Sequence, residues 1–148
     1  MIQKLKNSDR EVSKNIRSVF QASYAIEAKL LNAVDFPPLK RTLESYIKCD
    51  NDFFGYFKNK ELAGVIEIKH HETFTHIQSL VVHPNFFRQG IGKELMTFVL
   101  NSFPLKPIIV ETGLKNGPAT ELYKKFNLIE VKQWDTNHGI RKIRFERK

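Results

Sequence analysis

A glycine-containing segment near the middle of the chain has the composition of an anion-binding site. Residues 77–93 read IQSLVVHPNFFRQGIGK, where an apolar run is followed by a short break and then by a helical pattern. The first turn of a helix offers free backbone N–H groups and the positive end of the helix dipole. Gly90 and Gly92 leave that backbone open to close approach, and Arg88 and Lys93 add positive charge. The segment therefore predicts a site for a phosphate group.

Two common phosphate-binding motifs do not fit this spacing. A P-loop requires Gly-x-x-x-x-Gly-Lys followed by Ser or Thr, but Phe87 stands five positions before Gly92, and Glu94 follows Lys93. The dinucleotide fingerprint requires a third glycine where this chain has Leu95. It also belongs to a parallel strand–helix–strand unit, whereas this segment follows an antiparallel pattern. Both motifs are excluded.

The same residues resemble the acetyl-coenzyme A loop of the GCN5-related N-acetyltransferase (GNAT) family, which reads Gln/Arg-x-x-Gly-x-Gly/Ala. The motif maps onto residues 87–92, with Phe87 where the family usually has Gln or Arg. The resemblance implies that loop amides hold the pyrophosphate of acetyl-coenzyme A. It also implies a β-bulge at Leu80–Val82, whose backbone N–H polarises the thioester. The implied cofactor-binding residues of this part of the chain are Leu80, Val81, Val82, Arg88, Gln89, Gly90, Ile91, Gly92 and Lys93.

A second segment strengthens the resemblance. Residues 116–128, NGPATELYKKFNL, are similar to the family motif Asn-x-x-Ala-x-x-Leu-Tyr-x-x-x-Gly-Phe, with Asn127-Leu128 in place of Gly-Phe. The resemblance implies that Asn116 and Ala119 contact the cofactor arm and that Tyr123 lies near the thioester sulfur. A tyrosine has an ordinary pKa of about 10, above the value of about 8.5 for a thiol, so it stays protonated and can donate to the leaving sulfur. Tyr123 is the predicted general acid, and a tyrosine packed against the sheet is the alternative.

Three side chains are candidates for the general base that takes a proton from the acceptor amine. His76 lies on the strand where many relatives carry a glutamate, and an imidazole has an ordinary pKa of about 6.5. Glu67 lies on the neighbouring strand. Glu27 lies in the predicted loop after the first helix, which borders the acceptor site in relatives. A water-mediated base, or no base, is an equal alternative.

The acceptor pocket is expected between the first two helices. Glu27 is a predicted substrate-binding residue because its carboxylate suits a cationic amine. Phe36, in the run Phe36-Pro37-Pro38, is either a rigid wall of the pocket or part of a surface turn.

The periodicity of apolar residues predicts the elements that carry these groups. Ser8 and Glu11 read as a capping box that starts a helix fading near residues 24–28, and Pro38 starts a second helix. The other predicted elements are strands 2–5, 52–57, 62–69, 74–82, 108–111, 128–134 and 140–146, and helices 90–102 and 116–126. We predict one α/β (mixed α+β) domain over residues 1–148, with the GNAT-like acyl-CoA N-acyltransferase fold and a mixed, mostly antiparallel sheet flanked by helices.

Composition limits the remaining possibilities. The chain has 148 residues, a formal net charge of +8 and one cysteine, Cys49, which reads as a semi-buried side chain and not as a nucleophile. The charged N-terminus is unlike a signal peptide, and no apolar run reaches the roughly 18 residues of a membrane span, so a cytoplasmic protein without membrane partners is expected. His70, His71 and His76 lack the cysteine partners of a zinc site, and no metal is predicted.

The predicted function is transfer of an acetyl group from acetyl-coenzyme A to a primary amine of a small molecule or peptide. A longer acyl group or an oxygen acceptor is a second interpretation. A third is a non-catalytic acyl-CoA sensor or a basic nucleic-acid adaptor on the same fold. Nucleic acid is not a predicted partner, because the chain has no helix-turn-helix signature and no aromatic residues interleaved on a basic strand. A homodimer is left open, since relatives often dimerise.

Overall fold

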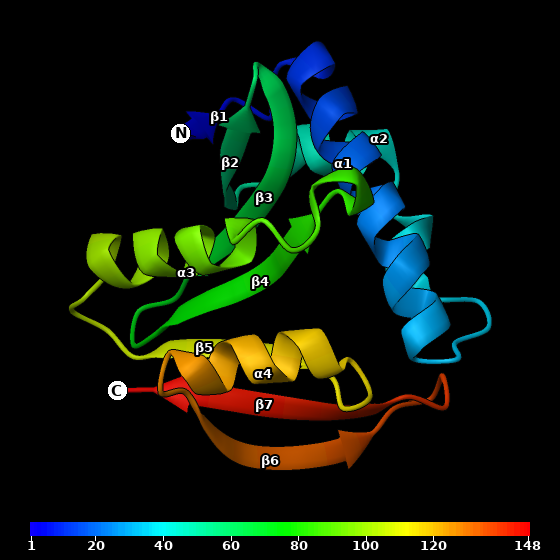
Figure 1. Ribbon diagram of the computed structural model, residues 1–148, viewed down its shortest axis with the longest axis vertical. Helices are drawn as coiled ribbons and strands as arrows, with labels where there is room; N and C mark the ends of the chain where they lie inside the picture. The colour runs from blue at the N-terminus through cyan, green and yellow to red at the C-terminus, as the bar shows by residue number, and fades with distance from the viewer.

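A seven-stranded sheet of order β1-β2-β3-β4-β5-β7-β6 forms the centre of the molecule, with helices on both faces (Figure 1). The computed structural model describes residues 1–148. In chain order the elements are β1 (Ile2–Leu5), α1 (Arg10–Leu30), the 3₁₀ helix η1 (Pro37–Lys40), α2 (Leu43–Lys48), β2 (Asp52–Lys58), β3 (Glu61–His70), β4 (Thr75–Val82), the 3₁₀ helix η2 (Pro84–Phe86), α3 (Ile91–Ser102), β5 (Ile108–Gly113), α4 (Gly117–Lys125), β6 (Ile129–Asp135) and β7 (Arg141–Arg147). Neighbouring strands are antiparallel except β4 and β5. The predicted fold class is confirmed.

Helix α1 begins one residue later than predicted and is longer. Asp9, not Ser8, is the N-cap, and its side chain accepts hydrogen bonds from the N–H groups of Glu11 and Val12. The helix does not fade near residues 24–28 but continues to Leu30. Asn32 then takes a left-handed conformation (φ 52°), which ends the helix. Glu27 therefore lies on the last turns of α1 and not in a loop.

The predicted second helix is two shorter elements. Pro37 and Pro38 start the 3₁₀ helix η1, which ends at Lys40. Arg41 and Thr42 are extended, and the Thr42 side chain caps the separate helix α2 through the N–H of Ser45. This break matters because it frees the Arg41 side chain to point toward the sheet.

Strands β4 and β5 are paired over only part of their length. Thr75, His76 and Ile77 pair in parallel with Ile108, Ile109 and Val110, and no further pairs follow. Beyond them the two strands diverge, as Figure 1 shows. The carboxyl-terminal parts, 78–82 of β4 and 111–113 of β5, thus leave the sheet open in its middle. The backbone groups that face this opening are not used by the β4–β5 ladder.

A β-bulge lies just where the strands separate. Ile77 and Ser79 oppose the consecutive residues Ile68 and Glu67, so Gln78 is the extra residue. The predicted position at Leu80–Val82 is therefore wrong, because pairing with β3 is regular there. The bulge changes the side-chain alternation, so that Ile77 joins the core under α3 and α4 while Ser79 points toward α1.

Two apolar clusters hold the helices to opposite faces of the sheet. Helices α3 and α4 cover one face, and the largest cluster there includes Leu95, Met96 and Phe145, all fully buried. Helices α1 and α2 cover the other face around Phe20 and Phe53. The backbone around the opening between β4 and β5 is therefore held by packed cores on both sides.

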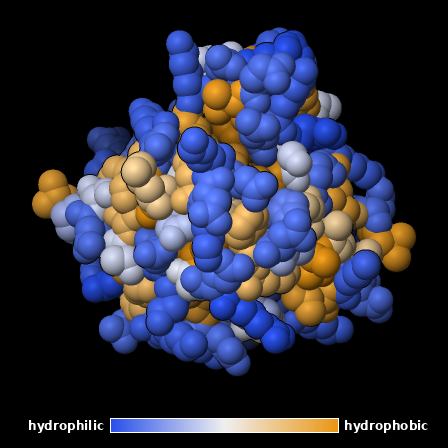
Figure 2. All heavy atoms as spheres, turned by 45° about the horizontal axis from the view of Figure 1, so that its top comes forward, coloured by the Kyte–Doolittle hydropathy of each residue, from blue (hydrophilic) through white to orange (hydrophobic).

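Hydrophilic side chains cover most of the face drawn in Figure 2, and apolar atoms lie between them in separate patches. The exposed large apolar side chains include Val34, Leu105 and Ile129. No helix is both long enough and apolar enough to cross a membrane.

Candidate active site

Two cavities meet at the opening between β4 and β5. The larger cavity, about 520 Å³, lies between the end of α1, η1, the two diverging strands and the β6–β7 turn. The second, which we call the loop cavity, has about 450 Å³ and lies between α1, the segment 86–92 and the start of α4. Both volumes fall in the usual range of small-molecule sites. The residues that line both cavities are Glu27, Leu80, Asn116, Ala119 and Tyr123.

The glycine segment has the geometry of an anion-binding loop. Arg88 (φ 63°) and Gly90 (φ 78°) both have left-handed backbones on either side of Gln89. None of the N–H groups of these three residues donates to a backbone carbonyl, and α3 begins directly afterwards at Ile91. The free N–H groups of the loop and of the first helical turn can therefore converge on a negative group.

Most of the predicted cofactor residues line the loop cavity. They are Leu80, Val82, Arg88, Gly90, Ile91, Gly92, Asn116 and Ala119. Three do not. Val81 is buried in the core beside α1. Gln89 accepts a hydrogen bond from Lys58, and Lys93 is exposed and does not line the cavity.

Asn116 links helix α4 to helix α1. Its Oδ1 accepts from the N–H of Ala119 (3.3 Å) and so caps α4. Its Nδ2 donates to Oε1 of Glu27 (2.6 Å), although the two residues are 89 positions apart. The capping bond fixes the orientation of the amide, and the amide in turn fixes the Glu27 carboxylate at the junction of the two cavities.

The Glu27 carboxyl is held in surroundings that disfavour its charge. Burial raises the pKa of Glu27 above its ordinary value, while the hydrogen bond from Asn116 and the charge of Lys142 act in the opposite direction. A carboxylate with a raised pKa is a stronger base than an exposed one. Glu27 can therefore accept a proton more readily than a glutamate with the ordinary pKa.

Tyr123 lies at the same junction of the two cavities. The residue lines both cavities, and its ring packs on Phe145 with centroids 5.8 Å apart. Burial, and to a smaller extent the charge of Glu27, raises the pKa of Tyr123. The phenol thus keeps its proton throughout the physiological range and can donate it to an atom held at the junction.

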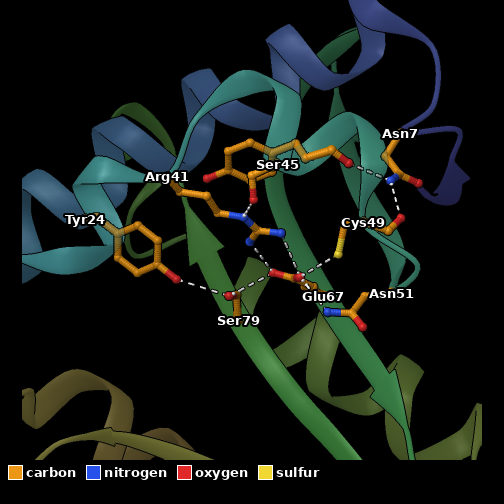
Figure 3. A network of polar contacts seen from close by, with 9 residues as sticks. Asn7, Tyr24, Arg41, Ser45, Cys49, Asn51, Glu67 and Ser79 are labelled. Carbon is orange, nitrogen blue, oxygen red and sulfur yellow. Dashed lines mark hydrogen bonds and ion pairs between the residues drawn. The ribbon is translucent and has the colours of Figure 1, made fainter.

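Glu67 lies at the centre of a network of polar contacts (Figure 3), and it does not line the larger cavity itself. Only 1% of its side chain is exposed. Its two oxygens accept from Nη1 and Nη2 of Arg41 at 2.8 and 3.1 Å. Asn51 Nδ2 donates to Oε2 (2.8 Å) and Ser79 Oγ donates to Oε1 (3.1 Å). With these donors its acceptor capacity is filled, and it does not reach the cavity.

Two residues of the cavity lining, Arg41 and Tyr24, are linked to the buried Glu67 carboxylate by hydrogen bonds. The guanidinium of Arg41 lines the cavity and lies 4.1 Å from the ring centroid of Tyr46. The hydroxyl of Tyr24 donates to Ser79 Oγ (3.1 Å), which donates onward to Glu67. Figure 3 shows this chain of bonds. The network fixes the cavity wall on the α1 side.

Cys49 belongs to the same network. Its Sγ approaches Oε2 of Glu67 at 3.6 Å. Burial raises the pKa of the thiol, which makes the reactive thiolate scarcer.

The remaining predicted site residues separate into two groups. Phe36 is buried and lines the larger cavity with Pro37 and Pro38. His76 lines neither cavity, and burial lowers its pKa. No group of three or more His, Cys, Asp or Glu side chains is arranged to hold a metal ion.

Sequence reasoning missed Arg41, Ser79 and Lys142, which all line the larger cavity. One signal for Arg41 was present. Glu67 stands within the apolar run of β3, and a buried carboxylate requires a cationic or donor partner. The sequence does not tell which of the 24 Lys and Arg residues supplies it.

The fold is shared with solved acetyltransferases. The chain is similar to the ribosomal-protein-S18-alanine N-acetyltransferase from Escherichia coli, at 16% identity and a TM-score of 0.76 over 99% of this chain and 91% of that one. It is also similar to the PaiA N-acetyltransferase from Thermoplasma acidophilum in complex with coenzyme A, at 18% identity and a TM-score of 0.75 over 100% and 99% of the two chains.

Sequence comparison identifies the family. The model of the acetyltransferase (GNAT) family matches residues 17–128, well over half of the chain. The chain belongs to this family. It is also 32% identical over 124 residues to the UPF0157 protein YqkA from Bacillus subtilis (strain 168). That match covers 83% of this chain but only 36% of the length of YqkA.

Proposed function

We propose that this protein transfers the acetyl group of acetyl-coenzyme A to a primary amine. The observation that carries the proposal is the meeting of two cavities at the opening between β4 and β5, with Glu27 and Tyr123 at their junction. One cavity ends at a loop suited to a pyrophosphate. The other is closed enough to orient a small acceptor.

The coenzyme would lie with its phosphates on the N–H groups of residues 88–93 and its arm along β4 beside Asn116 and Ala119. Solved relatives described with coenzyme A or acetyl-coenzyme A bound support this choice of donor. Phe87, where the family usually has Gln or Arg, contributes an apolar side chain to the rim of the loop cavity.

Glu27 and Tyr123 each carry out one of the two proton transfers of the reaction. The acceptor nitrogen attacks the thioester carbon, so that a C–N bond forms and the C–S bond breaks. Glu27, directly or through water, takes the proton that the nitrogen loses, and Tyr123 supplies a proton to the leaving sulfur. Solvent then restores both groups. Glu67 is proposed as a positioning residue that orients Arg41 and Ser79, and His76 has no role in this scheme.

The function is tested by thermal unfolding with acetyl-coenzyme A, followed by thiol release with a panel of amines. A ligand at about 100 times its dissociation constant adds roughly 2.7 kcal/mol to the free energy of unfolding. We expect a clear rise in Tm and release of free thiol only when an amine is present. A rise in Tm without release from any amine would favour the acyl-CoA sensor, and binding to duplex DNA that ignores acetyl-coenzyme A would favour the adaptor.

Replacing Glu27 with glutamine is expected to change the pH dependence of kcat. At neutral pH we expect kcat to fall about 100-fold, which is the usual contribution of a general base. The deficit should shrink as the pH rises, because hydroxide can then remove the proton that the attacking nitrogen loses. A deficit that stays constant with pH would contradict the role. The measurement is kcat against pH for both proteins.

The stability of the same variant supplies an independent readout. Because the folded-state pKa of Glu27 is raised, the ionised carboxyl costs stability above that pKa. Glu27→Gln should therefore raise Tm at pH 7–8, and the gain should disappear as the pH falls below the unfolded pKa of about 4.3.

A further inference from the structure

Some charged side chains of the larger cavity have an ion-pair partner in the protein, and one does not. Arg41 is bound by Glu67, and Glu111 lies 3.7 Å from Arg144. Lys142, on β7, lines the cavity and has neither an ion-pair nor a hydrogen-bond partner in the protein. An unpaired ammonium that is half-buried in a cavity is a natural contact for an anionic ligand.

The position of Lys142 separates it from the coenzyme. Glu27 lines both cavities, whereas Lys142 lines only the larger one. An anion bound by Lys142 is therefore not a phosphate in the loop cavity. The two residues are nevertheless close enough for the charge of Lys142 to act on the Glu27 carboxyl. One small molecule can contact both.

We propose that the acceptor is a zwitterionic amine of the amino-acid type, whose amine lies at Glu27 and whose carboxylate lies at Lys142. This inference rests on the proposed acetyl transfer, because it names the acceptor of that reaction. The amine end is the one at the junction, next to the thioester. The opposite orientation would put the carboxylate beside Glu27 and the ammonium beside Lys142, and both contacts would be repulsive.

The apolar part of the cavity wall suits the side chain of such an amino acid. Leu31, Phe36 and Ile140 form a buried apolar cluster, and all three line the cavity. An apolar side chain would bury its surface there. A diamine or polyamine is disfavoured, because its second cation would meet Lys142.

The test uses matched acceptors that differ in one charge. We would measure kcat/KM with acetyl-coenzyme A for L-leucine against L-leucinamide and for L-phenylalanine against L-phenylalaninamide. The wild-type protein should prefer each acid, and Lys142→Met should reduce the acid-to-amide ratio about 10- to 100-fold, which corresponds to one charged hydrogen bond. The change should appear mainly in KM for the acid. Using the ratio cancels any effect of the substitution on Glu27 or on the folding of the variant.

Two further variants complete the design. Lys142→Arg keeps the charge and should retain the preference for the acid. Lys132→Met removes a lysine from the neighbouring strand outside both cavities and should leave the ratio unchanged. An acid-to-amide ratio that is the same in wild type and Lys142→Met overturns the inference.

The outcomes also distinguish the two proposals. Acetylation of the amides without preference for the acids overturns the acceptor class and leaves acetyl transfer standing. Failure of acetyl-coenzyme A to raise Tm overturns acetyl transfer, and the acceptor class with it. A rise in Tm with no release from any acid also overturns the acceptor class.

Discussion

Replacing Tyr123 with phenylalanine is expected to lower kcat about 100-fold, the low end of the usual contribution of a general acid. Tyr123 lines both cavities, and its hydroxyl holds its proton because burial raises its pKa. Removing it leaves the leaving thiolate without a proton donor. The ring remains, so packing against Phe145 and the affinity for coenzyme A should change little.

The experiment compares single-turnover rates and coenzyme A dissociation constants of the two proteins. Tyr56→Phe is a suitable control, because Tyr56 lies on β2 outside both cavities. Turnover of Tyr123→Phe equal to that of the control would disprove the assignment. A rate that falls in step with coenzyme A affinity would instead make Tyr123 a structural contact of the coenzyme.

Replacing Arg41 with leucine should have the largest effect on stability. It leaves the Glu67 carboxylate, 1% exposed, without its only cationic partner. Breaking a buried ion pair in this way costs about 3–5 kcal/mol, a large part of the roughly 5–15 kcal/mol that stabilises a domain. Since each kcal/mol shifts Tm by about 2–4 °C at this chain length, we expect a fall of about 6–20 °C.

The matched control is Arg10→Leu, which breaks the exposed pair with Glu44. Exposed pairs contribute about 0–1 kcal/mol, so Tm should hardly move. A double variant, Arg41→Leu with Glu67→Leu, should regain most of the lost stability, because it leaves no buried charge. Equal losses for Arg41→Leu and Arg10→Leu would contradict the importance of the buried pair.

Local patterns in the sequence were sufficient for most of the elements and for both motifs, but not for the break between η1 and α2. The cap at Gly90, the helix that follows Asn116 and the left-handed Asn127 (φ 64°) are decided by residues a few positions apart. The end of α1 was misplaced, although Asn32 offered a signal for it. Tyr24 and Ala28 continue the apolar stripe, and no glycine or proline interrupts it.

The contacts that build the site depend on pairing across long stretches of chain. Glu67 and Arg41 are 26 positions apart, and Glu27 and Asn116 are 89 apart. No spacing rule joins such residues, because the fold and not the local helix or strand period brings them together. The predicted position of the bulge, Leu80–Val82 in place of Gln78, was wrong for a similar reason, because the register of a strand is set by its partner strand.

The short pairing of β4 with β5 also has a mechanical consequence. Three register pairs join the part of the sheet formed by β1–β4 to the part formed by β5–β7. The β2–β3 and β3–β4 ladders each have more register pairs than this one, so we expect the sheet to open most easily between β4 and β5. A molecule that fills the gap beyond Ile77 would brace the two strands from within. Under the proposed function, bound acetyl-coenzyme A would then stabilise the junction of β4 and β5 in addition to supplying the acetyl group.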